Sequence, residues 1–236
     1  MEEVSLAQRL EEVRQRIARA AARAGRDPAQ VTLVGITKGV PPERIRAAVE
    51  LGLGDVGENR AQELLAKQAA LPDLPVRWHF VGRLQTNKVR HVLGRVALIH
   101  SLDRWELAEV LDRRARTLGL RQDCLVQVNV AGEPTKAGIP PEQVRDFIGR
   151  VAPLPGIRVL GLMTIAPAAE DPEEVRPVFR RLRKLWEELR RDAPEGVEMR
   201  HLSMGMSADF EVAVEEGATL VRIGTAIFGH REAVQG

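Results

Sequence analysis

The sequence contains no tyrosine and only one cysteine among its 236 residues. One thiol excludes an internal disulfide and a zinc site built from several cysteines. Because Cys124 stands beside Leu125 and Val126 in an apolar run, we expect it to be a buried core thiol. The missing tyrosine excludes every site chemistry that needs a phenol as acid, base or hydrogen-bond donor.

Long apolar runs and a strong charge of one sign are also missing. No apolar stretch approaches the roughly 18 residues of a membrane span, so we expect no membrane segment. The 35 Lys and Arg side chains nearly balance the 33 Asp and Glu side chains, for a net charge of +2. The most basic segment, residues 176–184, has apolar residues at helical spacing, so we expect no nucleic-acid partner. The acidic, amphipathic first residues do not resemble a signal peptide, and we expect a cytoplasmic protein.

Eight short apolar runs recur along the chain, and a segment with helical periodicity separates each run from the next. Strict alternation predicts parallel strands joined by right-handed crossovers. Eight such units can close into a (β/α)8 barrel, the TIM-barrel fold, and an open doubly wound sheet is the alternative. The predicted strands occupy residues 31–37, 54–57, 76–81, 96–100, 123–129, 157–163, 198–202 and 219–223.

An extra helix precedes the first predicted strand. Its apolar residues fall on one face, and Ser5 and Gln8 have the spacing of a capping box. No linker is long enough to separate the chain into several domains. We therefore expect one domain over residues 1–236, in which an N-terminal helix within 1–30 packs on a barrel formed by 31–229.

The first predicted strand leads directly into Lys38. In a barrel of this kind, functional groups gather at the carboxyl ends of the strands, where the loops begin. A lysine after an apolar strand places its amine near the barrel mouth, and an amine withdrawn from water can react in its neutral form with an aldehyde. The structural alternative is a solvated lysine at a strand end.

The segments after the seventh and eighth strands are rich in Ser, Gly and Thr. Backbone N–H groups in such turns can cradle an anion, and many barrels bind phosphate at these two loops. The structural alternative is that Ser207 caps a helix and Gly224 makes a turn. Barrel closure would place the eighth strand beside the first, and so Lys38 beside the cradle. An amine next to a phosphate site is what a phosphorylated aldehyde cofactor requires.

Two more polar groups follow the second and third strands. Asn59 comes just after the second strand, where it can cap a helix or line a site. His79 stands between Trp78 and Phe80, a setting typical of a satisfied core histidine and compatible with a ligand contact.

Six segments occur together along the chain: LVGITKGVP, GENRAQE, WHFVGRLQTNK, QVNVAGEPTKAG, GLMTIAP and HLSMGMSADFEVAVEEGATLVRIGTAIFG. Running from about residue 31 to residue 229, they closely resemble the family of pyridoxal 5′-phosphate (PLP) homeostasis proteins. The resemblance implies a barrel related to the N-terminal domain of alanine racemase, the third fold type among PLP proteins. It also implies a protein that binds PLP as a Schiff base on a lysine and maintains vitamin B6 homeostasis, as a carrier or buffer without strong catalysis.

The same resemblance implies a cofactor site residue by residue. Lys38 corresponds to the Schiff-base lysine, and Arg222 to the arginine that faces the pyridine nitrogen. The chain departs from the family pattern around the lysine, where Ile36-Thr37-Lys38-Gly39-Val40 replaces a small-Ser-Lys-Thr pattern, a difference that concerns the local shape of the pocket. The other implied contacts are the pocket residues Asn59 and His79, and the phosphate contacts Ser203, Gly224 and Thr225.

The residue inventory disfavours a fast PLP enzyme. A guanidinium only donates, so an arginine facing the pyridine nitrogen leaves it unprotonated and makes the ring a poor electron sink. Alanine racemases use a tyrosine from a second domain as their second base, and only His79 or Cys124 could stand in for it here. We therefore expect no catalytic residues and no enzyme, with a low-activity amino-acid racemase or lyase as the alternative.

The remaining expectations concern partners. A barrel that binds RNA or protein is a third hypothesis, which rests only on the arginine content. We expect PLP as the ligand, apo forms of PLP-dependent enzymes as recipients, no metal, and a monomer, because the related racemase dimerises partly through the domain that has no counterpart here.

Overall fold

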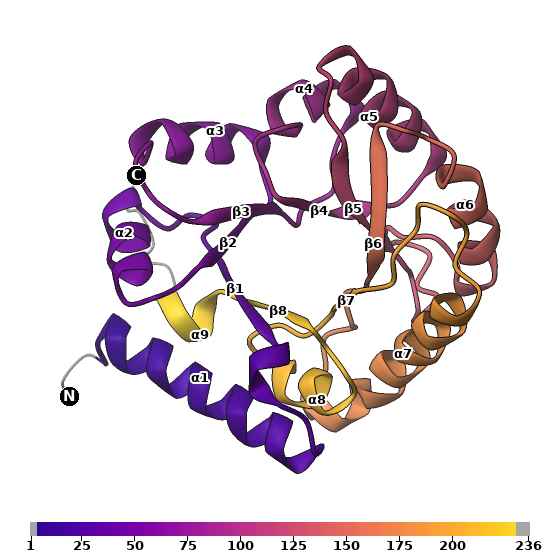
Figure 1. Cartoon of the computed structure of the whole chain (residues 1–236). Helices are drawn as coiled ribbons and strands as arrows, with labels where there is room; N and C mark the ends of the chain where they lie inside the picture. Colours follow the sequence, from indigo (N-terminus) through magenta and orange to yellow (C-terminus); the bar gives the residue numbers. More distant parts are fainter. Residues whose placement is uncertain (1–3, 230–236) are drawn as a thin grey trace.

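The eight predicted strands form a closed parallel barrel in the computed structural model, which describes residues 4–229. Helices surround this barrel as an outer ring (Figure 1). The strands are β1 (Thr32–Ile36), β2 (Asp55–Glu58), β3 (Arg77–Phe80), β4 (Leu98–Leu102), β5 (Gln122–Gln127), β6 (Ile157–Met163), β7 (His201–Ser203) and β8 (Leu220–Ile223). The α-helices are α1 (Leu6–Arg23), α2 (Pro42–Glu50), α3 (Ala61–Ala70), α4 (Val89–Val92), α5 (Trp105–Thr117), α6 (Val144–Val151), α7 (Arg176–Arg191), α8 (Phe210–Glu215) and α9 (Thr225–Phe228). Short 3-10 helices are η1 (Pro28–Gln30), η2 (Thr86–Lys88), η3 (Pro141–Gln143) and η4 (Pro172–Val175).

Pairing between the first and last strands closes the barrel. β1 pairs in parallel with β2 on one side and with β8 on the other, where Val34 lies opposite Arg222 and Gly35 opposite Ile223. The predicted (β/α)8 barrel is therefore confirmed, and the doubly wound open sheet is excluded. This register places Lys38, two residues beyond β1, close to the loop that follows β8.

The N-terminal helix α1 covers the seam where the barrel closes. The last barrel helix, α9, is a single turn, and α1 packs against both α8 and α9 (Figure 1). The predicted capping box is confirmed, because Ser5 Oγ accepts from the Gln8 N–H and the Gln8 side chain accepts from the Ser5 N–H. The single domain was predicted over residues 1–236, and of these 1–3 and 230–236 lie outside the described residues.

Two apolar layers hold these elements together. An inner layer fills the barrel with side chains such as Val34, Leu125 and Leu160, while an outer layer lies between the strands and the helices. Large branched side chains make such a barrel a packed core and not a pore. Cys124 belongs to the outer layer and is fully buried, which confirms the interpretation as a core thiol.

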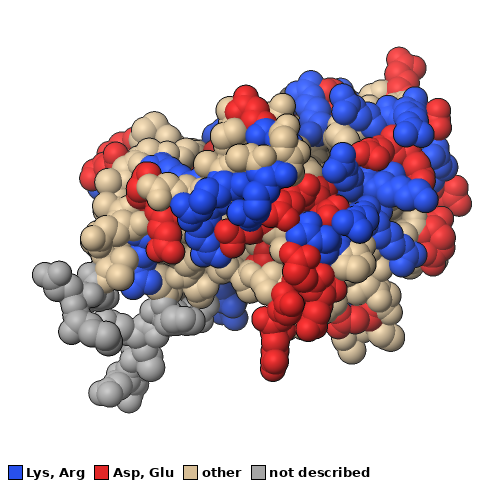
Figure 2. Space-filling model, turned by 90° about the horizontal axis from the view of Figure 1, so that it is seen from below, with Lys and Arg blue, Asp and Glu red and all other residues tan. Residues whose placement is uncertain are grey.

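Charged side chains of both signs are interspersed over the face that carries α1, α7 and α8 (Figure 2). Arg176, at the start of α7, contacts three carboxylates: Glu173 at 2.6 Å, Glu215 at 2.6 Å and Glu216 at 2.9 Å. Such networks tie neighbouring elements together more effectively than isolated surface pairs do. Within residues 4–229, no helix combines the length and the apolar character needed to cross a membrane.

Candidate functional site

Lys38 lies in a tight turn directly after β1, at the carboxyl end of the barrel. The turn depends on Gly39, whose φ of +68° lies in the left-handed region that favours glycine. The Lys38 side chain is half-buried. The turn that carries Lys38 is thus at the carboxyl end of the barrel, and attachment of a ligand to its amine stays a prediction.

A buried ion pair lies behind this turn, between β2 and α3. Lys67 donates to Glu58 Oε1 and to the Thr37 carbonyl oxygen, both at 2.5 Å. The Thr37 hydroxyl donates to the same carboxylate oxygen, also at 2.5 Å. Glu58 is fully buried and Lys67 nearly so. The pair therefore anchors the residue that immediately precedes Lys38.

A second contact anchors the residue that follows it. Glu63 accepts from the Gly39 N–H at 3.0 Å and lies 3.3 Å from Lys67 Nζ, to which it also pairs. We call Thr37, Glu58, Glu63 and Lys67 the Lys67 cluster. Sequence reasoning missed it, and the spacing of Glu63 and Lys67, four residues apart on a predicted helix, was the one available signal.

A cavity of about 420 Å³ opens at the carboxyl end of the barrel. Of the predicted site residues, Asn59 and Arg222 line it, together with side chains that include Ile36, Lys136 and Met206. Five predicted residues do not form its wall: Lys38, His79, Ser203, Gly224 and Thr225. Hydrogen bonds and packing contacts place His79 and Ser203 behind the wall, and Gly224 and Thr225 beside it.

Asn59, which lines this cavity, carries an unpartnered acceptor. Its Oδ1 atom is buried and has no hydrogen-bond partner among the described residues. The backbone of Asn59 is held tightly, because a Cβ on Gly82 would lie 2.2 Å from the Asn59 carbonyl oxygen. The helix that follows has Arg60 at its N-cap, so the structural alternative for Asn59, a helix cap, is wrong. A buried acceptor without a partner is rare in native proteins, so Asn59 is a candidate contact for a ligand that donates a hydrogen bond.

A chain of hydrogen bonds runs through the barrel interior and ends at the cavity. His79 joins Asp55 to His100, with 2.9 Å on each side, and His100 Nδ1 lies 2.8 Å from Ser203 Oγ. Arg222 then donates to Ser203 Oγ at 2.6 Å. His79 and Ser203 are thus buried links beneath the cavity wall. His100 and Asp55, which both lay within predicted strands, are the residues of this chain that sequence reasoning missed.

Arg222 is a buried cation at the floor of the cavity. Besides Ser203, it donates to the Thr164 carbonyl oxygen at 2.8 Å. Burial lowers the pKa of Arg222 to about 10, while the charge of Asp209 acts in the opposite direction. The guanidinium is therefore still charged at neutral pH, and it faces the cavity from a fixed position.

The loops after β7 and β8 meet at a hydroxyl. Ser207 Oγ accepts from the Gly224 and Ala226 N–H groups, at 3.3 Å each. The structural alternative for Ser207, a helix cap, is wrong, because the N-cap of α8 is Asp209. Gly224 packs against β1, since a Cβ built on it would lie 3.4 Å from the Ile36 carbonyl oxygen. The exposed turn at Gly224 and Thr225 thus lies next to the strand that leads to Lys38.

His100 should make the stability of the fold depend on pH. Burial first, and then the charges of His79, Arg222 and His201, hold the pKa of His100 well below its usual range. A histidine in the unfolded chain titrates near pH 6.5, so below that pH the unfolded state binds more protons and stability is lost as the pH falls. We expect His100 alone to lower the free energy of unfolding by about 1.4 kcal/mol between about pH 7.5 and about pH 5.5.

Urea unfolding at these two pH values measures the effect, with His100→Asn as the comparison. Asparagine can bridge neighbouring polar groups but does not titrate, so the variant should show a pH-dependent loss that is smaller by about the same 1.4 kcal/mol. An equal loss of stability in both proteins would show that His100 does not carry this dependence.

Taken together, the carboxyl end of the barrel combines four chemical groups: an amine on a fixed backbone, a buried cation, an unpartnered acceptor and a hydroxyl held by backbone amides. These suit an anionic ligand that carries both a hydrogen-bond donor and a carbonyl carbon. Within residues 4–229, no three His, Cys, Asp or Glu side chains are grouped so that they could hold a metal ion.

A family model and two relatives of known name match nearly the whole chain. The model of the family described as "Alanine racemase, N-terminal domain" matches residues 8–232. The pyridoxal phosphate homeostasis protein of Aquifex aeolicus is 53% identical over 225 residues, which cover 95% of this chain and 98% of that protein. The protein of the same name from Pseudomonas aeruginosa is 43% identical, with 97% of this chain and 96% of that protein covered.

Solved structures agree with the fold. PipY of Synechococcus elongatus, with PLP bound, has a TM-score of 0.84 and is 39% identical, covering 95% of this chain and all of that chain. Alanine racemase from Corynebacterium glutamicum, with a TM-score of 0.66 and 15% identity, shares the barrel fold over 94% of this chain and 62% of its own.

Proposed function

This chain belongs to the pyridoxal phosphate homeostasis protein family, and from that premise we propose that it binds PLP covalently on Lys38 and acts as a carrier or buffer of the cofactor. Two features of the cavity carry the proposal. Asn59 Oδ1 is buried there without a partner, and the Arg222 guanidinium faces the same space. The backbone of Lys38 is held on either side by the Lys67 cluster at the same end of the barrel.

The residues present fit this cofactor. When bound, PLP supplies an aldehyde that condenses with an amine and releases water. Lys38 would supply the amine. The Thr225 N–H and the Ser207 hydroxyl, which the Gly224 N–H orients, would hold the phosphate. Arg222 would donate to the pyridine nitrogen and, with a pKa of about 10, would not give up its proton at neutral pH. Asn59 Oδ1 would accept from a donor on the ring.

Both residues that could replace a second catalytic base are already engaged. His79 is buried and bridges Asp55 and His100. Cys124 lies in the apolar layer outside the barrel interior, and burial raises the pKa of its thiol far above the usual range. Neither group supports proton transfer at the cavity, which favours a carrier over the low-activity racemase or lyase. We further propose that the carrier is a cytoplasmic monomer that passes PLP to apo-enzymes.

The experiment that tests this function is a titration of the protein with PLP, followed by borohydride and peptide mapping. We expect a visible absorbance band that saturates at one equivalent, disappears on reduction and leaves the pyridoxyl group on the peptide that contains Lys38. A label spread over several surface lysines would refute the assignment. Incubation with common amino acids in deuterated water separates the alternatives, because steady exchange of the α-proton would indicate an enzyme.

A further inference from the structure

A second large pocket lies at the opposite end of the barrel, where the strands begin. It has a volume of about 610 Å³ and is bounded by α7, by the segment before β1 and by the turn before β8. None of the residues that line it contributes to the cavity near Lys38. It is therefore a separate feature that the proposed function does not use.

Hydrogen-bond donors dominate the lining of this basal pocket. Four arginines and one tryptophan line it, whereas Glu187 is its one acidic side chain. Arg183 already pairs with Glu187, at 2.8 Å. The four arginines are Arg26, Arg183, Arg190 and Arg191. The lining thus carries more positive charge than its own carboxylate can neutralise.

Arg26 and Arg183 show this imbalance directly. Arg26 is half-buried and donates to the carbonyl oxygens of Val214 and Ala218, at 2.5 Å and 2.9 Å. Burial and then the charge of Arg183 lower the pKa of Arg26. No carboxylate pairs with Arg26 within residues 4–229.

Trp186 adds an unpartnered donor at the same place. Its Nε1 atom is buried and has no hydrogen-bond partner within the described chain, while the Arg190 guanidinium lies over its ring, 5.2 Å from the ring centre. A buried indole N–H normally finds an acceptor. The Trp186 indole therefore adds a donor without an acceptor to a lining in which positive charge is already in excess.

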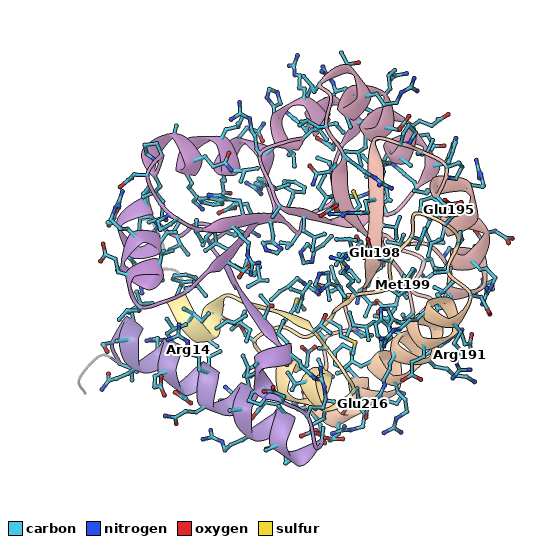
Figure 3. The ribbon with its side chains drawn as sticks, viewed as in Figure 1. Arg14, Arg191, Glu195, Glu198, Met199 and Glu216 are labelled. Carbon is cyan, nitrogen blue, oxygen red and sulfur yellow. The ribbon has the colours of Figure 1, made fainter. Side chains whose placement is uncertain are left out.

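Helix capping explains only some of this arrangement. Cations in the last turn of a helix stabilise its carboxyl end, which accounts for Arg190 and Arg191. It does not account for Arg183, two turns earlier. Arg26 caps the carboxyl end of α8 through the Val214 and Ala218 carbonyls, yet no carboxylate pairs with its charge within the described residues. Figure 3 shows that Glu195 and Glu198, in the loop after α7, lie apart from Arg191, and Glu198 pairs with Arg200.

We propose that the basal pocket binds a small phosphorylated anion, distinct from the cofactor at the other end of the barrel. A phosphate group offers several acceptors and up to two negative charges, and arginine forks match its geometry. Arg183 and Arg190 bind it from α7, while Arg26 and the Trp186 indole, in the same lining, contribute further positive charge and a donor. The volume admits a ligand larger than one phosphate group.

Pyrophosphate is the probe for this site, and calorimetry with the full-length chain is the measurement. In about 100 mM potassium chloride, where distant surface charges are screened, we expect saturable binding. Arg183→Gln combined with Arg190→Gln should weaken it by about tenfold or more. Trp186→Phe keeps the ring and removes the N–H, and should weaken it by a smaller factor.

Arg181→Gln is the matched control, because Arg181 lies on the same helix but donates to the Val130 carbonyl oxygen, away from the pocket. It should leave pyrophosphate binding unchanged, as should PLP at one equivalent, which occupies the cavity near Lys38. The proposal is overturned if wild-type protein shows no saturable binding, if Arg181→Gln weakens binding as much as the double variant, or if one equivalent of PLP prevents binding. That last result would place pyrophosphate in the cavity near Lys38, whereas absence of PLP binding would leave the basal site unaffected.

Discussion

Lys38→Ala should abolish the visible band that PLP produces with this protein, at every concentration tested. A methyl group cannot condense with an aldehyde, so the covalent component of binding is lost entirely. The substitution should not disturb the fold, because the Lys38 side chain is half-buried and forms no hydrogen bond or ion pair with the other described residues. We therefore expect the variant to fold and unfold like the wild type.

Lys136→Ala is the matched control for this experiment. Lys136 lines the same cavity but pairs with Glu133 at 2.8 Å, on a loop outside the barrel strands. Its removal should leave the band in place, with at most a modest change in affinity. A band that survives in Lys38→Ala and disappears in Lys136→Ala would show that PLP attaches to Lys136 and not to Lys38.

Non-covalent binding should persist in Lys38→Ala at a lower affinity. Arg222, Asn59 and the turn at Gly224 are unaffected by the substitution, and charge-assisted hydrogen bonds to a phosphate do not depend on the amine. Equilibrium dialysis of PLP with the variant measures this residual affinity. Total loss of binding would show that the cavity contributes little without the covalent bond.

The barrel was predictable because its signal is periodic and repeated eight times. Each apolar run appears in the structure as a strand, and the closure that brings β8 beside β1 followed from the number of units. The start of β7 was less predictable: apolar residues suggested 198–202, whereas the strand is His201–Ser203. Gly161, with φ of +147°, packs directly on the His201 carbonyl oxygen, and pairing with β6 begins at this contact.

The buried polar chain could not be derived from the sequence. His79, His100, Ser203 and Arg222 come from four different strands, and whether they meet depends on the stagger of those strands around the barrel. A shift of one residue would turn any of these side chains to the other face. The family resemblance named three of the four, but it could not show that they are linked.

Lys67 is the clearest case of a role that only the fold creates. In the sequence it is one lysine among many on an amphipathic helix, where a solvated position is the usual outcome. The structure rotates α3 so that Lys67 points inward, into contact with Glu58 and the Thr37 carbonyl. Its partner Glu58 stands at the end of a strand, and only barrel geometry brings the two together.

Lys67→Met should destabilise the protein severely, by about 3–5 kcal/mol. The substitution leaves the Glu58 carboxylate fully buried without a cation, and Glu58 Oε2 already lacks a partner. Because domains of this size are stable by only about 5–15 kcal/mol, such a loss is a large fraction of the total. Urea unfolding measures it, and Lys184→Met, which removes an exposed lysine on α7, should change the free energy of unfolding very little.

The same substitution should weaken covalent attachment of PLP, although Lys67 does not line the cavity. Without Lys67, the Thr37 carbonyl loses its donor and the turn that carries Lys38 is less constrained, so the amine is less well positioned. Under conditions where the variant is still folded, the visible band should form more slowly and saturate at a higher PLP concentration. Borohydride reduction after fixed times would compare the two proteins directly.

Adding Glu58→Gln to Lys67→Met separates the charge from the packing. A neutral amide in place of the carboxylate removes the uncompensated charge, so the double variant should recover most of the lost stability. The double variant should still attach PLP slowly at Lys38, because the donor to the Thr37 carbonyl is still missing. If the double variant were no more stable than Lys67→Met alone, the ion pair would not be the source of the loss. Recovery of both stability and attachment would instead show that the Lys67 cluster holds the fold together without positioning Lys38.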